Sequence, residues 1–269
     1  MLGNVLKRHF YIFMLAKLFL VFFLGLCWGS FLNVLIYRFK DKKSFLKGRS
    51  YCPHCHHYLG ILDLIPLFSF IFLKGRCRYC HQKISWQYPL VEFFTGLLFL
   101  LSVSCFNFQS VSHPYLLIFR NFLFISFFLI IFVYDLRYLL IPDEIVLSGI
   151  VLAFIFNLLL GYSWHKLVLA GLIGSGFFLL QYLISQGKWI GFGDVKLGLL
   201  IGFFVSWPKI LLVLFFAYLF GAIIGSFLLL TKKRNLKSEI PFGPFLVFAT
   251  FITLFWGEQI ICWFKRLIG

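Results

Sequence analysis

Long apolar runs separated by short polar segments dominate this 269-residue chain. A run of about 20 apolar residues is long enough to cross the hydrocarbon core of a bilayer as a helix. The pattern therefore predicts about eight transmembrane helices, at residues 11–37, 89–106, 115–134, 144–161, 166–186, 194–207, 209–230 and 243–264. The run at 194–207 is short and interrupted by glycines, which indicates a half-span or a broken helix.

One long polar segment, residues 38–88, interrupts this pattern between the first two apolar runs. The chain is therefore expected to have three parts: a first transmembrane segment at 1–37, an insert at 38–88 and a transmembrane core at 89–269. The predicted fold class is an all-α membrane protein with a soluble insert between its first two spans.

The composition supports a membrane protein and argues against a soluble one. The chain is 61% hydrophobic and 13% charged, whereas soluble proteins are about half apolar and about a quarter charged. The net charge of +16 could suggest a nucleic-acid partner, but the Lys and Arg residues occupy short segments between apolar runs. Such placement is typical of residues that fix membrane orientation, so no nucleic-acid partner is expected.

The distribution of basic residues predicts that the insert is cytoplasmic. The insert contains ten Lys and Arg residues. If it is cytoplasmic, alternation places the loops near 135–143, 187–193 and 231–242 on the same side. About two thirds of the 25 Lys and Arg residues then lie there, in accord with the positive-inside rule. The basic residues close to the two ends of the chain run against this bias.

The insert contains two C-x-x-C pairs, CPHC at Cys52 and Cys55 and CRYC at Cys77 and Cys80. Two such pairs at this separation can close a tetrahedral four-thiolate site, which suits structural zinc. Two disulfides or free thiols are the alternatives, but a cytoplasmic insert faces a reducing compartment, where disulfides are rare. Four nearby histidines are expected to be solvated loop residues: His54, His56, His57 and His81.

Carboxylates near membrane spans are the candidates for chemistry, because the chain has only nine Asp and Glu residues and a carboxylate at membrane depth is costly. Asp135 ends an apolar run in FVYDLRYLLIPDE, and Asp194 lies in WIGFGDVKLG. Two carboxylates brought together can share one proton. One can then activate a water while the other protonates a tetrahedral intermediate. Gly191 and Gly193 are expected to break the helix before Asp194 and admit a substrate strand.

Structural roles remain open for these two residues. Asp135 could pair with Arg137 as an anchor at the membrane interface, and Asp194 could cap a helix with Lys196 nearby. Asp135 and Asp194 are nevertheless favoured as a functional pair, because both fall on the same predicted side of the membrane.

Asp143 and Glu144 are rivals for the role of Asp135. They follow Pro142 at a predicted helix start, where acidic residues are common, so they rank below Asp135.

The first two spans carry polar groups for which packing roles are expected. Asn33 and Ser30 are predicted to form interhelical hydrogen bonds, aided by close packing at Gly25 and Gly29. Glu92 is expected to have a structural or positioning role.

Eight short motifs follow one another along the chain: GSFLNVLIYR, CPHC, DLIPLFS, KGRCRYC, ISWQYPLVE, D-x5-IPD, GFGDVK and PFGPFL. In this order, over residues 25–250, they resemble the prepilin leader peptidase/N-methyltransferase family. The resemblance implies a membrane aspartic peptidase of the GxGD class, with Asp135 (from D-x5-IP) and Asp194 (from GxGD) as the catalytic pair. It also implies that Cys52, Cys55, Cys77 and Cys80 bind zinc.

The same resemblance implies a multi-pass protein of the bacterial inner or plasma membrane. Its substrates would be type IV prepilins or pseudopilins, cleaved on the cytoplasmic side. Many members also methylate the new N-terminus with S-adenosylmethionine. The DLIP form at Asp63–Pro66 resembles the branch that serves competence pseudopilins. The chain has no glycine-rich nucleotide fingerprint, so no residue is assigned to the methyl donor, while membrane lipid is expected as a partner.

Two other functional classes remain open from the residues alone. An ion-coupled transporter could use intramembrane Asp residues to bind cations. A zinc-bearing scaffold without chemistry would retain its function when both Asp residues are replaced.

Overall fold

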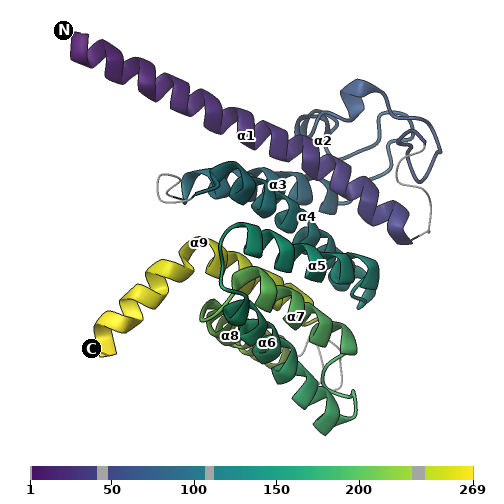
Figure 1. Cartoon of the computed structure of the whole chain (residues 1–269). Helices are drawn as coiled ribbons and strands as arrows, with labels where there is room; N and C mark the ends of the chain where they lie inside the picture. The colour runs from purple at the N-terminus through teal and green to yellow at the C-terminus, as the bar shows by residue number, and fades with distance from the viewer. Residues whose placement is uncertain (1, 41–47, 107–111, 232–239, 269) are drawn as a thin grey trace. The chain divides into compact units, whose positions relative to one another are not determined.

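The computed structural model of the chain describes residues 2–40, 48–106, 112–231 and 240–268. These residues are mostly helical and form no strand, only two isolated β-bridges. The helices are α1 (Leu2–Lys40), η1 (Ile61–Asp63), α2 (Phe68–Phe72), α3 (Gln87–Ser104), α4 (Pro114–Tyr138), α5 (Asp143–Leu159), α6 (Trp164–Ser185), α7 (Phe192–Val205), α8 (Lys209–Leu230) and α9 (Gly243–Ile268) (Figure 1). The predicted all-α class is therefore confirmed.

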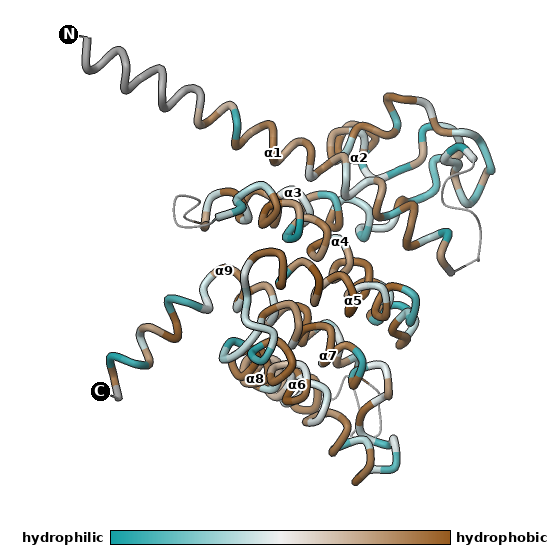
Figure 2. The backbone as a smooth tube through the Cα atoms, viewed as in Figure 1, coloured by the Kyte–Doolittle hydropathy of each residue, from teal (hydrophilic) through white to brown (hydrophobic). Residues whose placement is uncertain are grey.

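Six of these helices are long and apolar enough to cross a membrane: α1 from Met14, α3, α4, α6, α8 and α9 up to Leu267. The other two predicted spans correspond to α5, with 17 residues, and α7, with 14. Helices α5 to α8 are predominantly hydrophobic along their lengths (Figure 2). The chain is a multi-pass membrane protein, and eight is an approximate count of its spans.

The chain divides into two compact units. The first contains residues Met1–Phe106 together with Asn121–Ser126 of α4. The second contains residues Asn107–Arg120 and Phe127–Gly269.

In the first unit, α1 and α3 approach closely through glycines. A Cβ atom on Gly25 would lie 2.6 Å from the Cα of Gly96, and one on Gly29 would lie 2.7 Å from the Cα of Glu92. Small residues are typical of such contacts between membrane helices, because backbones can then pack directly. The predicted role of Gly25 and Gly29 is confirmed.

Hydrogen bonds add to this packing. The Asn33 amide donates to the carbonyl oxygen of Tyr88 at 3.1 Å, and Gln87 donates to Asn33 Oδ1 at 3.3 Å. Ser30 hydrogen-bonds Glu92. The predicted interhelical hydrogen bonds of Asn33 and Ser30 are therefore present.

Glu92 is buried and connects α3 to the insert. Its Oε2 atom accepts a hydrogen bond of 2.8 Å from the backbone N–H of Leu67. Leu67 precedes α2 and has φ of 60°, a region that non-glycine residues rarely adopt. The carboxylate thus holds this turn in place, which agrees with the positioning role expected for Glu92.

In the second unit, α7 is the central helix and contacts α5, α6, α8 and α9 (Figure 1). A helix that is apolar on all sides is usually buried. Two close backbone contacts join α7 to α6: a Cβ on Gly198 would lie 2.6 Å from the Gly174 carbonyl oxygen, and one on Gly202 would lie 2.4 Å from that of Ala170. The glycines in the 194–207 run therefore serve tight packing.

The helix α7 is continuous from Phe192 to Val205, so the broken-helix alternative is wrong. Its 14 residues are fewer than the roughly 20 that a full span needs, and the half-span interpretation stays a prediction. Gly191 caps the helix, and Gly193 lies inside its first turn. These glycines therefore begin a helix instead of breaking one before Asp194. In the loop predicted at 231–242, residues 232–239 lie outside the described part of the chain.

Candidate active site and metal centre

Asp135 lies in the last turn of α4 and is buried, with 5% of its surface exposed. The helix ends because Leu139 adopts the left-handed conformation and donates its N–H to the Asp135 carbonyl oxygen at 2.9 Å. A left-handed residue of this kind commonly terminates helices. It turns the chain directly into the segment that contains Ile141.

Asp194 lies in the first turn of α7 and is also buried, with 8% of its surface exposed. Its backbone N–H donates to the Gly191 carbonyl oxygen at 3.1 Å. Its Oδ1 atom is fully buried and has no hydrogen-bond partner among the described residues. A buried carboxylate oxygen without a partner is costly, so this atom is a candidate for contact with a substrate or a water.

Three of the sequence motifs lie close together around these two carboxylates: D-x5-IPD, GFGDVK and PFGPFL. A Cβ on Gly193 would lie 3.0 Å from Ile141, so the segment after α4 packs against the start of α7. The backbone N–H of Gly243, at the start of α9, donates to Asp135 Oδ2 at 3.0 Å. Asp135 and Asp194 are close enough for a direct electrostatic interaction. The structure thus brings the predicted pair together.

The rival carboxylates lie on the surface. Asp143 forms a salt bridge with Lys196 at 2.8 Å, and its side chain is 54% exposed. Glu144 is exposed in the first turn of α5. Lys196 is therefore the partner of Asp143, and the alternative in which Lys196 accompanies a capping Asp194 loses its support.

One residue near Asp194, Tyr218, was not found by reasoning from the sequence. Tyr218 of α8 interacts electrostatically with Asp194. Its hydroxyl donates to Gln181 Oε1 of α6 at 2.7 Å, and its ring lies 5.1 Å from that of Phe242. Polar side chains such as Gln181 and Tyr218 in the apolar runs of α6 and α8 could have indicated this part of the site. Hydropathy alone, however, does not show which face of a helix such a side chain occupies.

The four paired cysteines form one cluster in the insert. The Sγ atoms of Cys52, Cys55, Cys77 and Cys80 all lie within 4.8 Å of one another. Those of Cys52 and Cys80 are 3.8 Å apart. A tetrahedral zinc site with Zn–S bonds of about 2.3 Å requires Sγ atoms about 3.8 Å apart. The donor set and its spacing therefore fit a structural zinc ion.

The two halves of this cluster have the same local structure. The N–H of His56 donates to the Cys52 carbonyl oxygen, and the N–H of His81 donates likewise to Cys77. Both histidines have positive φ, 56° and 57°, and their side chains are exposed. They shape the turns, as expected of loop residues. All seven cysteines of the chain are free thiols, so the disulfide alternative has no support.

Deprotonation of the cysteine thiols in this cluster depends on a bound metal ion. The Gln82 backbone N–H lowers the pKa of Cys80, but burial and hydrogen bonds among the four thiols raise it to about 12. Metal binding deprotonates such thiols.

Asp63 ties the DLIP turn to the second cysteine pair. Burial raises the pKa of Asp63, but hydrogen bonds and the charge of Arg78 outweigh burial and lower it. Arg78 Nε donates to Asp63 Oδ1 at 2.6 Å, and Tyr79 donates to Oδ2 at 3.2 Å. The insert is thus stabilised by these polar contacts as well as by the sulfur cluster.

Comparison with family models gives two matches. The model of the bacterial peptidase A24 N-terminal domain matches residues 23–106. The model of the type IV leader peptidase family matches residues 122–226, which contain both Asp135 and Asp194.

Several similar proteins share the name prepilin leader peptidase/N-methyltransferase. One from Aeromonas salmonicida (strain A449) is 32% identical over 93% of this chain and 94% of its own length. One from Bacillus subtilis (strain 168) is 31% identical over 92% of this chain and 98% of its own length. One from Myxococcus xanthus (strain DK1622) is 35% identical over 80% of this chain and 64% of its own length. No solved structure matches the chain.

Proposed function

This chain belongs to the type IV leader peptidase family, and we propose that it is an aspartic endopeptidase that cleaves the leaders of type IV prepilins or pseudopilins. The relatives above carry the peptidase name, and none carries the name of an ion-coupled transporter. The proposal rests on one observation: the buried carboxylates of Asp135 and Asp194 lie close enough to interact electrostatically.

In the proposed mechanism the two carboxylates act on one water and one peptide bond. Neighbouring carboxylates share a proton, because like charges at short range disfavour double ionisation. The ionised member takes a proton from the attacking water, and the protonated member donates to the carbonyl oxygen of the scissile bond. The Gly243 N–H fixes one oxygen of Asp135, while Oδ1 of Asp194 has no partner among the described residues.

The site is proposed to lie at the cytoplasmic side of the bacterial inner or plasma membrane. Basic residues concentrate in the insert and in the loops assigned to the same side, as the positive-inside rule predicts for cytoplasmic segments. A prepilin has a basic leader followed by a long apolar helix. In this orientation the apolar helix can remain in the bilayer while the scissile bond reaches Asp135 and Asp194.

Two further assignments complete the proposal. Cys52, Cys55, Cys77 and Cys80 would hold a structural zinc ion, which would stabilise an insert too small to fold on an apolar core alone.

By the name of its relatives, the protein would also methylate the new N-terminus. S-adenosylmethionine would supply the methyl group, and we assign no residue of this chain to it.

The test is cleavage of a model prepilin by the purified full-length protein in detergent. Asp135→Asn and Asp194→Asn are expected to slow cleavage by about 10⁴-fold or more, with zinc content unchanged. Asp143→Asn and Glu144→Gln are matched controls that should cleave at nearly the wild-type rate. Retention of near-full activity in either of the first two variants, or no cleavage by the wild type, would refute the proposal.

A further inference from the structure

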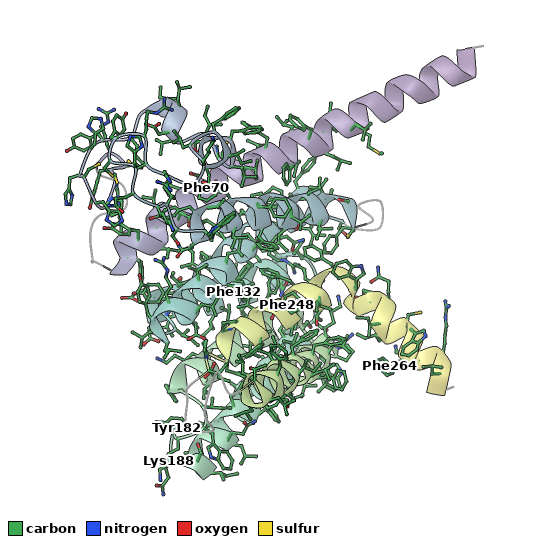
Figure 3. All side chains as sticks on the ribbon, turned by 180° about the vertical axis from the view of Figure 1, so that it is seen from behind. Phe70, Phe132, Tyr182, Lys188, Phe248 and Phe264 are labelled. Carbon is green, nitrogen blue, oxygen red and sulfur yellow. The ribbon has the colours of Figure 1, made fainter. Side chains whose placement is uncertain are left out.

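The first unit contains an open groove of about 740 Å³ beside the cysteine cluster. Its walls are formed by α2 and the turn after it, the segment that follows the second cysteine pair, and the first turns of α3. The side chain of Phe70, labelled in Figure 3, packs against Trp86 with ring centroids 5.0 Å apart. Apolar side chains form most of the lining, so the groove suits an apolar ligand.

The groove opens at the N-terminal end of α3, a helix long and apolar enough to cross a membrane. Its wall includes Leu90 and Phe93, exposed residues in the first turns of this membrane-spanning helix. Trp86 comes directly before α3 and is 69% exposed. Tryptophan is enriched at the boundary between bilayer and water. The groove is therefore continuous with the exposed apolar surface of α3.

Large apolar side chains of η1 and α2 are exposed. In η1 and α2, Ile61 is 86% and Phe72 is 80% exposed, and Ile71 is 67% exposed on the groove wall. An apolar patch of this kind on a soluble segment marks an interaction surface. A short apolar element next to a membrane span can bury such side chains in the bilayer interface.

Three cations lie around the groove: Lys74, Arg76 and Lys83. All three are exposed, and no ion pair joins them to a carboxylate in the described ranges. Arg76 and Lys83 oppose each other in an antiparallel bridge, an arrangement that is unfavourable for like charges. No Asp or Glu lines the groove. A bound anion would relieve this repulsion.

We propose that this groove binds an anionic phospholipid of the surrounding membrane. An acyl chain would continue from the surface of α3 between Phe70 and Leu90, and the headgroup phosphate would contact Lys74, Arg76 and Lys83. The apolar lining distinguishes this ligand from a free phosphate ion. The bound lipid would fix the insert against the bilayer, and this inference does not depend on the peptidase proposal.

The test is native mass spectrometry of the zinc-loaded full-length protein titrated with phosphatidylglycerol or phosphatidylcholine of the same acyl chains. The wild type is expected to prefer phosphatidylglycerol. The triple variant Lys74→Gln/Arg76→Gln/Lys83→Gln should lose this preference by about tenfold or more. The charge-conserving variant Lys74→Arg/Lys83→Arg should keep it. The three single Gln variants are measured alongside, so that the test does not depend on the triple variant folding.

A second triple variant, Lys166→Gln/Lys188→Gln/Lys265→Gln, removes the same charge from exposed positions of the second unit and should retain the preference. An equal loss in this control would show a bulk charge effect and overturn the proposal. The proposal also fails if the wild type has no preference, or if the groove variants retain both zinc and the preference.

Discussion

The backbone N–H of Gly243 donates a hydrogen bond of 3.0 Å to Asp135 Oδ2 across 108 positions of the sequence. Hydrogen bonds to a carboxylate are stronger than those between neutral groups. Gly243 begins α9 and Asp135 lies in the last turn of α4, so this contact fixes the carboxylate between two helices. A Cβ at position 243 would lie only 2.6 Å from the same oxygen, so any larger residue here would have to displace the carboxylate.

Gly243→Ala is therefore expected to displace the Asp135 carboxylate. A displacement of about 1 Å can slow catalysis by about 100-fold, and a loss of this order in kcat/KM for prepilin cleavage is predicted. Gly225→Ala is the control, because a Cβ at position 225 has no neighbour within 4 Å. Equal activities of the two variants would show that the close approach at Gly243 has no role.

Zinc bound to the insert should be measurable as one ion per chain by elemental analysis. Cys52→Ser or Cys77→Ser is expected to release it and to lower the thermal stability of the protein, because metal binding contributes to folding. Cys27→Ser and Cys262→Ser should retain zinc, since both residues lie in helices outside the cluster. Full zinc occupancy in the Cys52→Ser variant would contradict the four-thiolate assignment.

Zinc affinity is also expected to depend on pH. The thiols must lose protons to bind the ion, and the pKa of Cys80 is raised to about 12 without it. Protons therefore compete with zinc, so the apparent affinity should fall as the pH is lowered. A chelator competition assay at several pH values measures this, and an affinity that does not change with pH would contradict it.

The contact of α1 with α3 predicts a stability effect in the first unit. Gly29→Ala would place a Cβ atom 2.7 Å from the Cα of Glu92, so the helices must separate. Overpacking of this kind costs about 1–3 kcal/mol, which should lower the melting temperature in detergent. Gly176→Ala introduces the same methyl group in α6 with no neighbour within 4 Å. The packing account is wrong if Gly29→Ala melts no lower than this control.

The hydrogen bond from Leu67 to Glu92 predicts a local effect on the insert. Glu92→Ala removes the acceptor that holds the Leu67 turn. Because a single hydrogen bond contributes about 0.5–1.5 kcal/mol, amide exchange in residues 67–72 should accelerate by about two- to tenfold. Glu92→Gln keeps an acceptor oxygen and should show a smaller change. Unchanged exchange in Glu92→Ala would mean that other contacts hold the turn.

The order of apolar and polar residues along the sequence predicts much of the fold. Long apolar runs predicted the membrane helices, because bilayer thickness fixes their length. Paired C-x-x-C spacing predicted the cysteine cluster, since the ligands of such a pair are local in sequence. Asp135 and Asp194 were identifiable because carboxylates are rare in apolar surroundings.

Contacts between distant residues could not be predicted in the same way. Gly243 has no functional side chain, so only the packing of α9 on α4 reveals its hydrogen bond to Asp135. Arg120 is another example. It lies inside the apolar run predicted at 115–134, where hydropathy names no partner for it. The structure buries it, with its guanidinium hydrogen-bonded to Asn157 and 4.9 Å from the centre of the Phe204 ring.

The central claim, that Asp135 and Asp194 act as one catalytic unit, is tested most directly by a double-mutant cycle. The cleavage rates of Asp135→Asn, Asp194→Asn and the double variant are compared with the wild type on the same prepilin. Residues that act as a unit are strongly non-additive, so the double variant should be no slower than either single variant. A double variant slowed by the product of the two single effects, or a single variant that cleaves at nearly the wild-type rate, would contradict the claim.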